Sequence, residues 1–188
     1  MKIILASNSP RRKELLAGLG LNFDTRVIDG IDESYPSDIP VKDVALYIAE
    51  KKSAAYTIAD NELLLTADTV VVVDNLILGK PKDSIEAIRM LKKISGRSHQ
   101  VITGVCMKSL EKTVKFSVST DVTFKTLSNT EIDYYIKKYK PFDKAGAYGI
   151  QEWIGYIGVT DIKGSYFNVM GLPLQRIYTA LKSNFNVI

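Results

Sequence analysis

The sequence predicts an α/β protein in which helices flank a sheet. Strand-like apolar segments alternate along the chain with segments whose apolar residues recur at helical spacing. Leu63–Val73 is apolar on both faces, as expected of a central strand, whereas Val114–Phe124 alternates apolar and polar residues and predicts a strand with one face in water. The chain has 188 residues and 46% hydrophobic content. It is therefore long enough for one well-packed domain, or for one domain with two lobes.

The first predicted strand and helix bring positive charge to the start of the helix. Lys2–Ala6 predicts the strand, and Ser9 and Pro10 are typical of the N-cap and first turn of a helix. Arg11 and Arg12 follow at the positive end of the helix dipole, where each is disfavoured by roughly 0.3–1 kcal/mol unless an anion compensates. Backbone N–H groups, hydroxyls and two guanidiniums together suit a phosphate group. A basic surface turn is the alternative.

A carboxylate and a lysine stand where apolar residues are expected. Asp68 lies in the middle of the apolar strand, where an ionised side chain is costly unless it is paired, hydrogen-bonded or bound to a metal. A bulge or a strand break at Asp68 is the alternative. Lys52 falls near the centre of the apolar face of a helix predicted over 41–59. Its ammonium therefore either extends to the surface or points towards an interior anion.

The other elements are predicted by caps, spacing and turn residues. Asp83–Ile94 and Ser128–Lys138 each begin with a capping residue and a glutamate three positions later, which predicts a capping box and a helix. A closing helix is predicted from Pro173 on. Phe142–Gln151 is small and glycine-rich, so its backbone can approach a ligand closely. Further strands are predicted at Asn22–Ile28 and at Gln100–Met107.

Several kinds of chemistry are excluded by what the sequence lacks. It contains neither the glycine-rich P-loop motif nor the dinucleotide-binding motif. Its single histidine, His99, rules out a histidine-rich metal site and is expected to make a structural hydrogen bond. The single cysteine, Cys106, lies in a predicted strand and is expected to be buried, so no disulfide is expected.

Charge and hydropathy indicate the kind of partner. The net charge of +4 is mild and spread along the chain, which favours a small anionic substrate over a nucleic acid. There is no apolar run of about 18 residues, so no membrane partner is expected. No signal segment is recognised at the N-terminus, and we expect a cytoplasmic location.

The remaining polar residues suit a divalent cation and a polyphosphate. Oxygen ligands favour Mg²⁺ or Mn²⁺, which would bridge substrate phosphates, while cationic side chains offset the charge on the phosphate oxygens. A nucleoside triphosphate fits this combination. Asp68 would hold the metal, accept a proton from an attacking water, or both. The carboxylates concerned are Asp32, Glu33 and Asp68, and the cations are Arg11, Arg12, Lys52, Lys80 and Lys144.

A series of short segments, in order over nearly the whole chain, is far more specific together than any one of them alone. These segments are Ala6–Arg12, Thr66–Val70, Gly79–Pro81, Ser95–Arg97 with His99, Thr103–Val105, Asp143–Gln151, Ser165–Tyr166 and Val169–Pro173. On these residues the chain resembles the Maf proteins, which are nucleoside triphosphate pyrophosphatases.

The resemblance implies roles for individual residues. Asp68 would be the proton acceptor that activates water, and Glu33 would help Asp68 to hold the metal. Four residues would contact phosphates, namely Ser9, Arg12, Lys52 and Lys80.

The resemblance also implies which base is recognised. Arg11, Thr69 and Gln151 look like the substrate-discriminating positions of the family. The ending Gly149-Ile150-Gln151 is similar to the subgroup that acts on dTTP and UTP. A glutamine amide offers a donor beside an acceptor, which matches the edge of uracil or thymine, and a methyl group at C5 decides little.

The resemblance completes the expected architecture and reaction. It implies one domain over residues 1–188, with a two-lobed mixed sheet flanked by helices, like an inosine-triphosphatase fold, and a central cleft as the site. Metal-assisted attack of water on the α-phosphorus would give a nucleoside monophosphate and pyrophosphate, preventing incorporation of non-standard nucleotides. Modified pyrimidine nucleotides are further candidate substrates, and a homodimer is expected.

Three alternatives to this function remain at the level of sequence. A nucleotide-binding regulator of cell division or septum formation, without essential catalysis, is one. A phosphatase that removes only the terminal phosphate is another. A nucleic-acid-binding protein is the least favoured, because no basic stripe is present.

Overall fold

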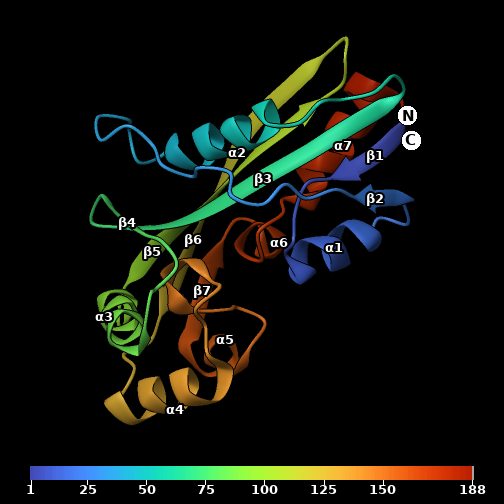
Figure 1. The fold of residues 1–188 in the computed structure, drawn as a ribbon. Helices are drawn as coiled ribbons and strands as arrows, with labels where there is room; N and C mark the ends of the chain where they lie inside the picture. The colour runs from blue at the N-terminus through green and yellow to red at the C-terminus, as the bar shows by residue number, and fades with distance from the viewer. Residues whose placement is uncertain (188) are drawn as a thin grey trace. The chain divides into compact units, whose positions relative to one another are not determined.

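The computed structural model describes residues 1–187, whose strands form a single mixed sheet (Figure 1). Along the sheet the order is β2-β1-β3-β5-β6-β7, and β4 pairs with β3 off this path. Strand β1 runs parallel to β2 and β3, whereas β4 is antiparallel to β3 and β7 is antiparallel to β6. The strands are β1 (Lys2–Leu5), β2 (Phe23–Thr25), β3 (Glu62–Val73), β4 (Leu76–Leu78), β5 (Ser98–Lys108), β6 (Thr113–Phe124) and β7 (Val159–Lys163).

Helices flank this sheet, which confirms the predicted α/β class with a mixed sheet. They are α1 (Pro10–Ala17), α2 (Val44–Ala54), α3 (Ser84–Ile94), α4 (Asn129–Tyr139), α5 (Trp153–Gly158), α6 (Tyr166–Val169) and α7 (Leu174–Phe185), with a short 3₁₀ turn, η1, at Ala145–Ala147. No helix within residues 1–187 is both long and apolar enough to cross a membrane.

The chain forms two compact units, each made of several segments. The first unit comprises residues 1–68, 103–118 and those from 171 on, and the second comprises residues 69–102 and 119–170. Strands β3, β5 and β6 therefore contribute residues to both units.

In the first unit, helix α2 packs against the strands that carry the predicted site. The hydroxyl of Thr66 on β3 donates a hydrogen bond to the carbonyl oxygen of Ala49 on α2, at 2.7 Å, and α2 lies along β3 in Figure 1. A Cβ atom at Gly104 of β5 would lie 2.3 Å from the backbone nitrogen of Leu46, so only glycine allows α2 to approach this closely. The position of α2 is thus fixed from two strands.

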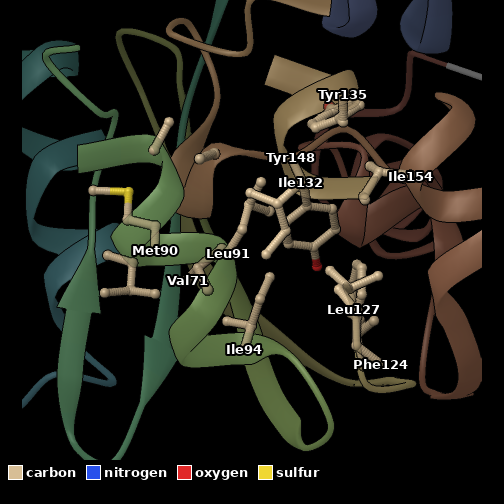
Figure 2. Packing of buried hydrophobic residues seen from close by; sticks show 14 of the residues in the cluster. Val71, Met90, Leu91, Ile94, Phe124, Leu127, Ile132, Tyr135, Tyr148 and Ile154 are labelled. Carbon is tan, nitrogen blue, oxygen red and sulfur yellow. The ribbon is translucent and has the colours of Figure 1, made fainter. Parts of the chain in front are cut away.

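The second unit has the larger apolar core described here (Figure 2). Figure 2 shows the ring of Tyr148 among Leu91 and Ile94 of α3 and Leu127 before α4. His99 packs edge-on against Tyr148, and its Nε2 atom lies 2.7 Å from the Tyr148 hydroxyl. The expected structural hydrogen bond of His99 is therefore confirmed.

Several predicted boundaries need correction. The helix predicted over 41–59 is only Val44–Ala54, because Tyr56 and Ile58 continue the apolar pattern as buried residues of the loop that follows. The second strand is only Phe23–Thr25. The segments that form α5 and α6 are apolar, but the sequence did not predict whether they are helices or strands. Strand β7 was not predicted.

The two predicted capping boxes differ in the structure. At α4 the box is complete, since Ser128 and Glu131 each accept a hydrogen bond from the other's backbone N–H. At α3 Asp83 accepts from the N–H of Glu86, but the Glu86 carboxylate accepts from the N–H of Lys82 instead. The helix start was predicted correctly there, and the reciprocal partner was wrong.

Candidate active site

Helix α1 begins as the sequence predicts. The side chain of Ser9 accepts a hydrogen bond from the backbone N–H of Arg12, at 3.4 Å, and Pro10 is the first helical residue. Ser7 in turn accepts from the N–H of Ser9, at 3.2 Å. The first turn of α1 contains no acidic residue, and its Arg11 is half-buried. The positive end of the helix dipole and these cations therefore favour an anion at this point.

The guanidinium of Arg12 is held in place by backbone carbonyls. Its Nε donates to the carbonyl oxygen of Gly171 and its Nη1 to that of Ala67, each at 2.8 Å. Burial lowers the pKa of Arg12, and the nearby carboxylates of Asp68 and Glu33 oppose this effect. Arg12 is consequently a cation of fixed position near Asp68, the carboxylate in the middle of strand β3.

Lys52 joins the two carboxylates that the sequence assigns to the metal. Its Nζ atom lies 2.7 Å from Asp68 Oδ1 and 2.8 Å from Glu33 Oε1. The side chains of Lys52 and Asp68 are only 14% and 13% exposed, whereas that of Glu33 is 46% exposed. Strand β3 continues through Asp68 without a break, so the alternative of a strand break is wrong. The prediction that Lys52 points towards an interior anion is confirmed.

A second ion pair, between Lys51 and Asp32, lies next to the first one in the sequence. Lys51 Nζ lies 2.6 Å from Asp32 Oδ2 and 3.0 Å from the carbonyl oxygen of Ser34. The Lys51 ammonium, together with the hydroxyl and N–H of Ser34, holds the pKa of Asp32 well below its usual value. Asp32 and Glu33 belong to the long connection between β2 and α2, so consecutive lysines of α2 bind consecutive carboxylates of that loop. The loop is thereby fixed beside Asp68.

The donor atoms near Asp68 fit a small divalent cation that binds together with a phosphate. Within residues 1–187, no group of three or more His, Cys, Asp or Glu side chains is gathered closely enough to hold a metal ion. Asp68 and Glu33 instead offer carboxylate oxygens around one ammonium. Mg²⁺ is commonly bound by one or two carboxylates, with substrate phosphates and water as the other ligands. This pair therefore suits Mg²⁺ or Mn²⁺ in company with a polyphosphate.

The first unit brings together most of the residues that the sequence assigns to chemistry. Arg12, Asp68, Glu33 and Lys52 are linked by the contacts above, and Ser9 caps the helix that carries Arg12. Arg11 belongs to the same helix, and the other three assigned residues belong to the second unit. There Thr69 follows Asp68 on β3, Lys80 is exposed after β4, and Gln151 is half-buried before α5.

Sequence reasoning missed a second polar cluster, in the second unit. The ammonium of Lys144, grouped in the sequence with the substrate-binding cations, lies 2.8 Å from Asp143 Oδ1 and 3.1 Å from Glu152 Oε1. The hydroxyl of Tyr135 donates to Glu152 Oε2 and accepts from the N–H of Gly149, at 3.0 Å. Tyr135 fits the apolar face of its helix, and Glu152 interrupts no pattern. The sequence therefore carried no signal for this cluster.

Comparison with known proteins gives the family. A curated relative from Phocaeicola vulgatus, named dTTP/UTP pyrophosphatase, is 58% identical over 96% of this chain and 95% of its own length. Relatives of the same name from Parabacteroides distasonis and Flavobacterium psychrophilum are 57% and 50% identical, also over 96% of this chain and over 95% and 93% of their own lengths.

Among solved structures, a HAM1 protein from Coxiella burnetii is 15% identical, with a TM-score of 0.48 over 97% of this chain and 98% of that one. The family model described as Maf-like protein matches residues 2–184. This match covers all of the segments on which the resemblance rests, and the chain belongs to the Maf family.

Proposed function

We propose that this chain is a hydrolase that cleaves dTTP and UTP to the nucleoside monophosphate and pyrophosphate. The observation that carries the proposal is the Lys52 ammonium held between Asp68 and Glu33, beside a fixed arginine. Paired carboxylates and convergent cations suit metal-assisted attack on a polyphosphate. The relatives named dTTP/UTP pyrophosphatase, at 50–58% identity, support the choice of substrate.

Asp68 is the proton acceptor in this proposal. Its Oδ1 atom binds Lys52, which fixes the plane of the carboxylate, and Oδ2 is the atom that we assign to the attacking water. The side chain is little exposed and lies on an unbroken central strand, so its position varies little. A base held in this way contributes by orientation as well as by accepting the proton.

The phosphate-binding residues would act by position and charge. Arg12 is anchored through two of its N–H groups, so little reorganisation is needed when a phosphate approaches. The hydroxyl of Ser9 adds a neutral donor at the positive end of a helix. Lys52 and, in the second unit, Lys80 supply the remaining positive charge.

Asp68 and Glu33 are the residues that would hold the divalent cation. When bound, Mg²⁺ or Mn²⁺ would polarise the phosphoryl oxygens and offset the charge that develops on them. The two carboxylates attract the cation, and the neighbouring Arg12 and Lys52 limit the net negative charge that remains without substrate. The identity of the cation stays a prediction.

Base recognition is assigned to Arg11, Thr69 and Gln151. The Gln151 amide would donate to one carbonyl of uracil or thymine and accept from the ring N–H. Cytosine presents its donor and acceptor in the reverse order, so the amide in this orientation cannot pair with it. Discrimination of this kind depends on leaving polar groups unpaired with the wrong base. A homodimer and a cytoplasmic location also stay predictions, as does a role in removing non-standard nucleotides.

Product analysis in ¹⁸O-labelled water tests the function directly. The protein is incubated with dTTP or UTP and Mg²⁺ or Mn²⁺, and the products are identified by ³¹P NMR and mass spectrometry. We expect pyrophosphate together with a monophosphate that carries the label, because water attacks the α-phosphorus. Orthophosphate with a nucleoside diphosphate would instead indicate a terminal phosphatase. Absence of any product from these substrates would refute the proposal.

A further inference from the structure

A hydrogen-bonded network holds the residues on both sides of Gln151, which precedes helix α5. We call it the Tyr135 network, and its members are Tyr135, Lys144, Gly149 and Glu152. Lys144 Nζ contacts Glu152 Oε1 at 3.1 Å, the Tyr135 hydroxyl donates to Glu152 Oε2, and the Gly149 N–H donates to that hydroxyl at 3.0 Å. The network thus closes across the segment 144–152.

The composition of the network is unusual for a purely stabilising contact. The side chains of Lys144 and Glu152 are 9% and 20% exposed, and Tyr135 is fully buried. Apolar residues of similar volume often stabilise a buried position at least as well as an ion pair does. A fully connected polar network instead favours one conformation over its neighbours. Its value here is therefore in specifying the path of the segment 144–152.

The backbone on both sides of Gln151 is held by this network. On one side, Gly149 binds Tyr135 through its N–H, and its carbonyl accepts from the N–H of Glu152 at 3.0 Å. On the other side, Glu152 is fixed through both carboxylate oxygens. A Cβ atom at Gly149 would lie 3.0 Å from Glu152 Cδ and from Lys144 Cε, so a larger residue there would push on the side chains of the network itself.

The network is in turn anchored in the core of the second unit. Tyr135 belongs to the central turns of α4, whose start is fixed by a complete capping box, and it lies in the cluster that Figure 2 shows. Tyr139, one turn further along α4, stacks on its ring. Ile150, which lies between Gly149 and Gln151 in the sequence, is also buried. Rigidity of the core therefore extends to the backbone of Gln151.

We propose that Tyr135, Lys144 and Glu152 are positioning residues that orient the Gln151 amide and so determine discrimination between pyrimidine bases. This inference rests on the proposed function, in which Gln151 contacts the base. An amide that offers a donor beside an acceptor selects a base only if its plane is fixed, because a small rotation removes one of the two hydrogen bonds. The network fixes the backbone from which that amide extends.

Tyr135→Phe tests the proposal, because it removes one hydroxyl and keeps the ring in the core. We expect KM for UTP to rise by roughly 5- to 20-fold and kcat to change by less than about threefold. The ratio of kcat/KM for UTP to that for CTP should fall by about the same factor as KM rises. In a Gln151→Ala background the same substitution is expected to have little further effect on that ratio. Non-additivity of this kind would show that Tyr135 acts through Gln151.

Tyr134→Phe is the matched control. Tyr134 neighbours Tyr135 on α4, and its hydroxyl accepts from the exposed Lys138 rather than from the segment 144–152. We expect this variant to retain wild-type KM and base preference. Equal effects of both substitutions would contradict the proposal, as would a Tyr135→Phe effect that adds in full to that of Gln151→Ala.

Hydrogen–deuterium exchange gives a readout that does not depend on turnover. In Tyr135→Phe, amides of the peptide 144–152 should exchange roughly tenfold faster or more, while those of β3 keep their protection. Unchanged exchange in this peptide would overturn the positioning role even if the enzyme is active. If wild-type protein hydrolyses neither dTTP nor UTP, the proposed function fails, and the exchange result still decides whether the network orders Gln151.

Discussion

Each unit of the molecule contains a little-exposed lysine between two carboxylates, and the two arrangements differ in what surrounds them. Lys52 lies between Asp68 and Glu33, and Lys144 lies between Asp143 and Glu152. In both groups one carboxylate is sheltered and the other is exposed. The chemistry of the two groups is therefore nearly the same, and their environments must account for any difference in function.

The environments differ in how firmly the partners are fixed. Glu152 is also bound by the Tyr135 hydroxyl, which itself accepts from the backbone, so that group is closed by neutral donors. Glu33 instead comes from the long loop before α2, and the group around Lys52 lies beside the cation Arg12. A ligand can consequently replace a partner of Lys52 more easily than a partner of Lys144. We infer that Lys52 serves binding and catalysis, whereas Lys144 serves the path of the chain.

The largest expected effect is that of Asp68→Asn on turnover. The amide keeps the size of the side chain but cannot accept a proton, so kcat for dTTP should fall by about 10²-fold or more while the far-UV circular dichroism spectrum is unchanged. Asp32→Asn is the matched control, since Asp32 is a carboxylate that pairs with Lys51 of α2 rather than with Lys52. We expect less than about threefold change there. Retained turnover in Asp68→Asn would remove Asp68 from the mechanism.

Lys144→Met tests the structural role that we infer for the second lysine. Removing the ammonium leaves the little-exposed carboxylate of Glu152 without its charged partner, which should lower the free energy of unfolding by about 3 kcal/mol in urea denaturation. Lys52→Met should lower it less, because Asp68 keeps a second cation beside it in Arg12, while turnover is largely lost. Reversed effects of the two substitutions would contradict the roles inferred for these lysines.

The contrast between the two lysines also explains what the sequence could predict. Asp68 was recognisable because a carboxylate interrupts a strand that is apolar on both faces, and Lys52 because it lies on an apolar helix face. Family resemblance added Glu33, which no local pattern distinguishes from Asp32. The Tyr135 network was not predictable, because Tyr135 obeys the helical pattern and its partner Glu152 is distant in sequence.

Fold prediction succeeded and failed for similar reasons. Strands β1, β3, β5 and β6 and helix α4 have clear periodicity or caps, and their predicted bounds agree closely with the structure. Helix α2 was overextended because Tyr56 and Ile58 are buried for tertiary reasons, in a core shared with β1 and β3. In a single sequence, an apolar residue that is buried in a loop cannot be distinguished from one on the apolar face of a helix.

The second unit should also impose a pH dependence on stability through the only histidine of the chain. Burial lowers the pKa of His99 from 6.5 to about 4. Between these values the unfolded chain binds a proton that the folded chain does not, so stability falls as pH falls through this range and is retained above it. The part due to His99 should be about 2 kcal/mol between pH 7 and pH 5.

Two measurements check this dependence. Urea unfolding at both pH values should show a smaller pH effect in His99→Gln than in the wild type, by about that 2 kcal/mol. In the wild type, the single histidine signal in ¹H NMR should not titrate between pH 8 and pH 5. A midpoint near 6.5 in the folded protein would show that the ring is not held neutral by burial.

The smallest expected effects compare two serine caps, one in each unit. Ser128 belongs to a complete capping box, so Ser128→Ala should cost about 1 kcal/mol of stability and leave KM for dTTP unchanged. Ser9 makes a longer cap bond, of 3.4 Å, and is assigned to phosphate binding, so Ser9→Ala should cost about 0.5 kcal/mol but raise KM severalfold. The two variants thus separate helix stability from anion binding. If both variants changed KM equally, the loss of a helix cap would explain the effect of Ser9→Ala, and a contact between the Ser9 hydroxyl and a phosphate would not be needed.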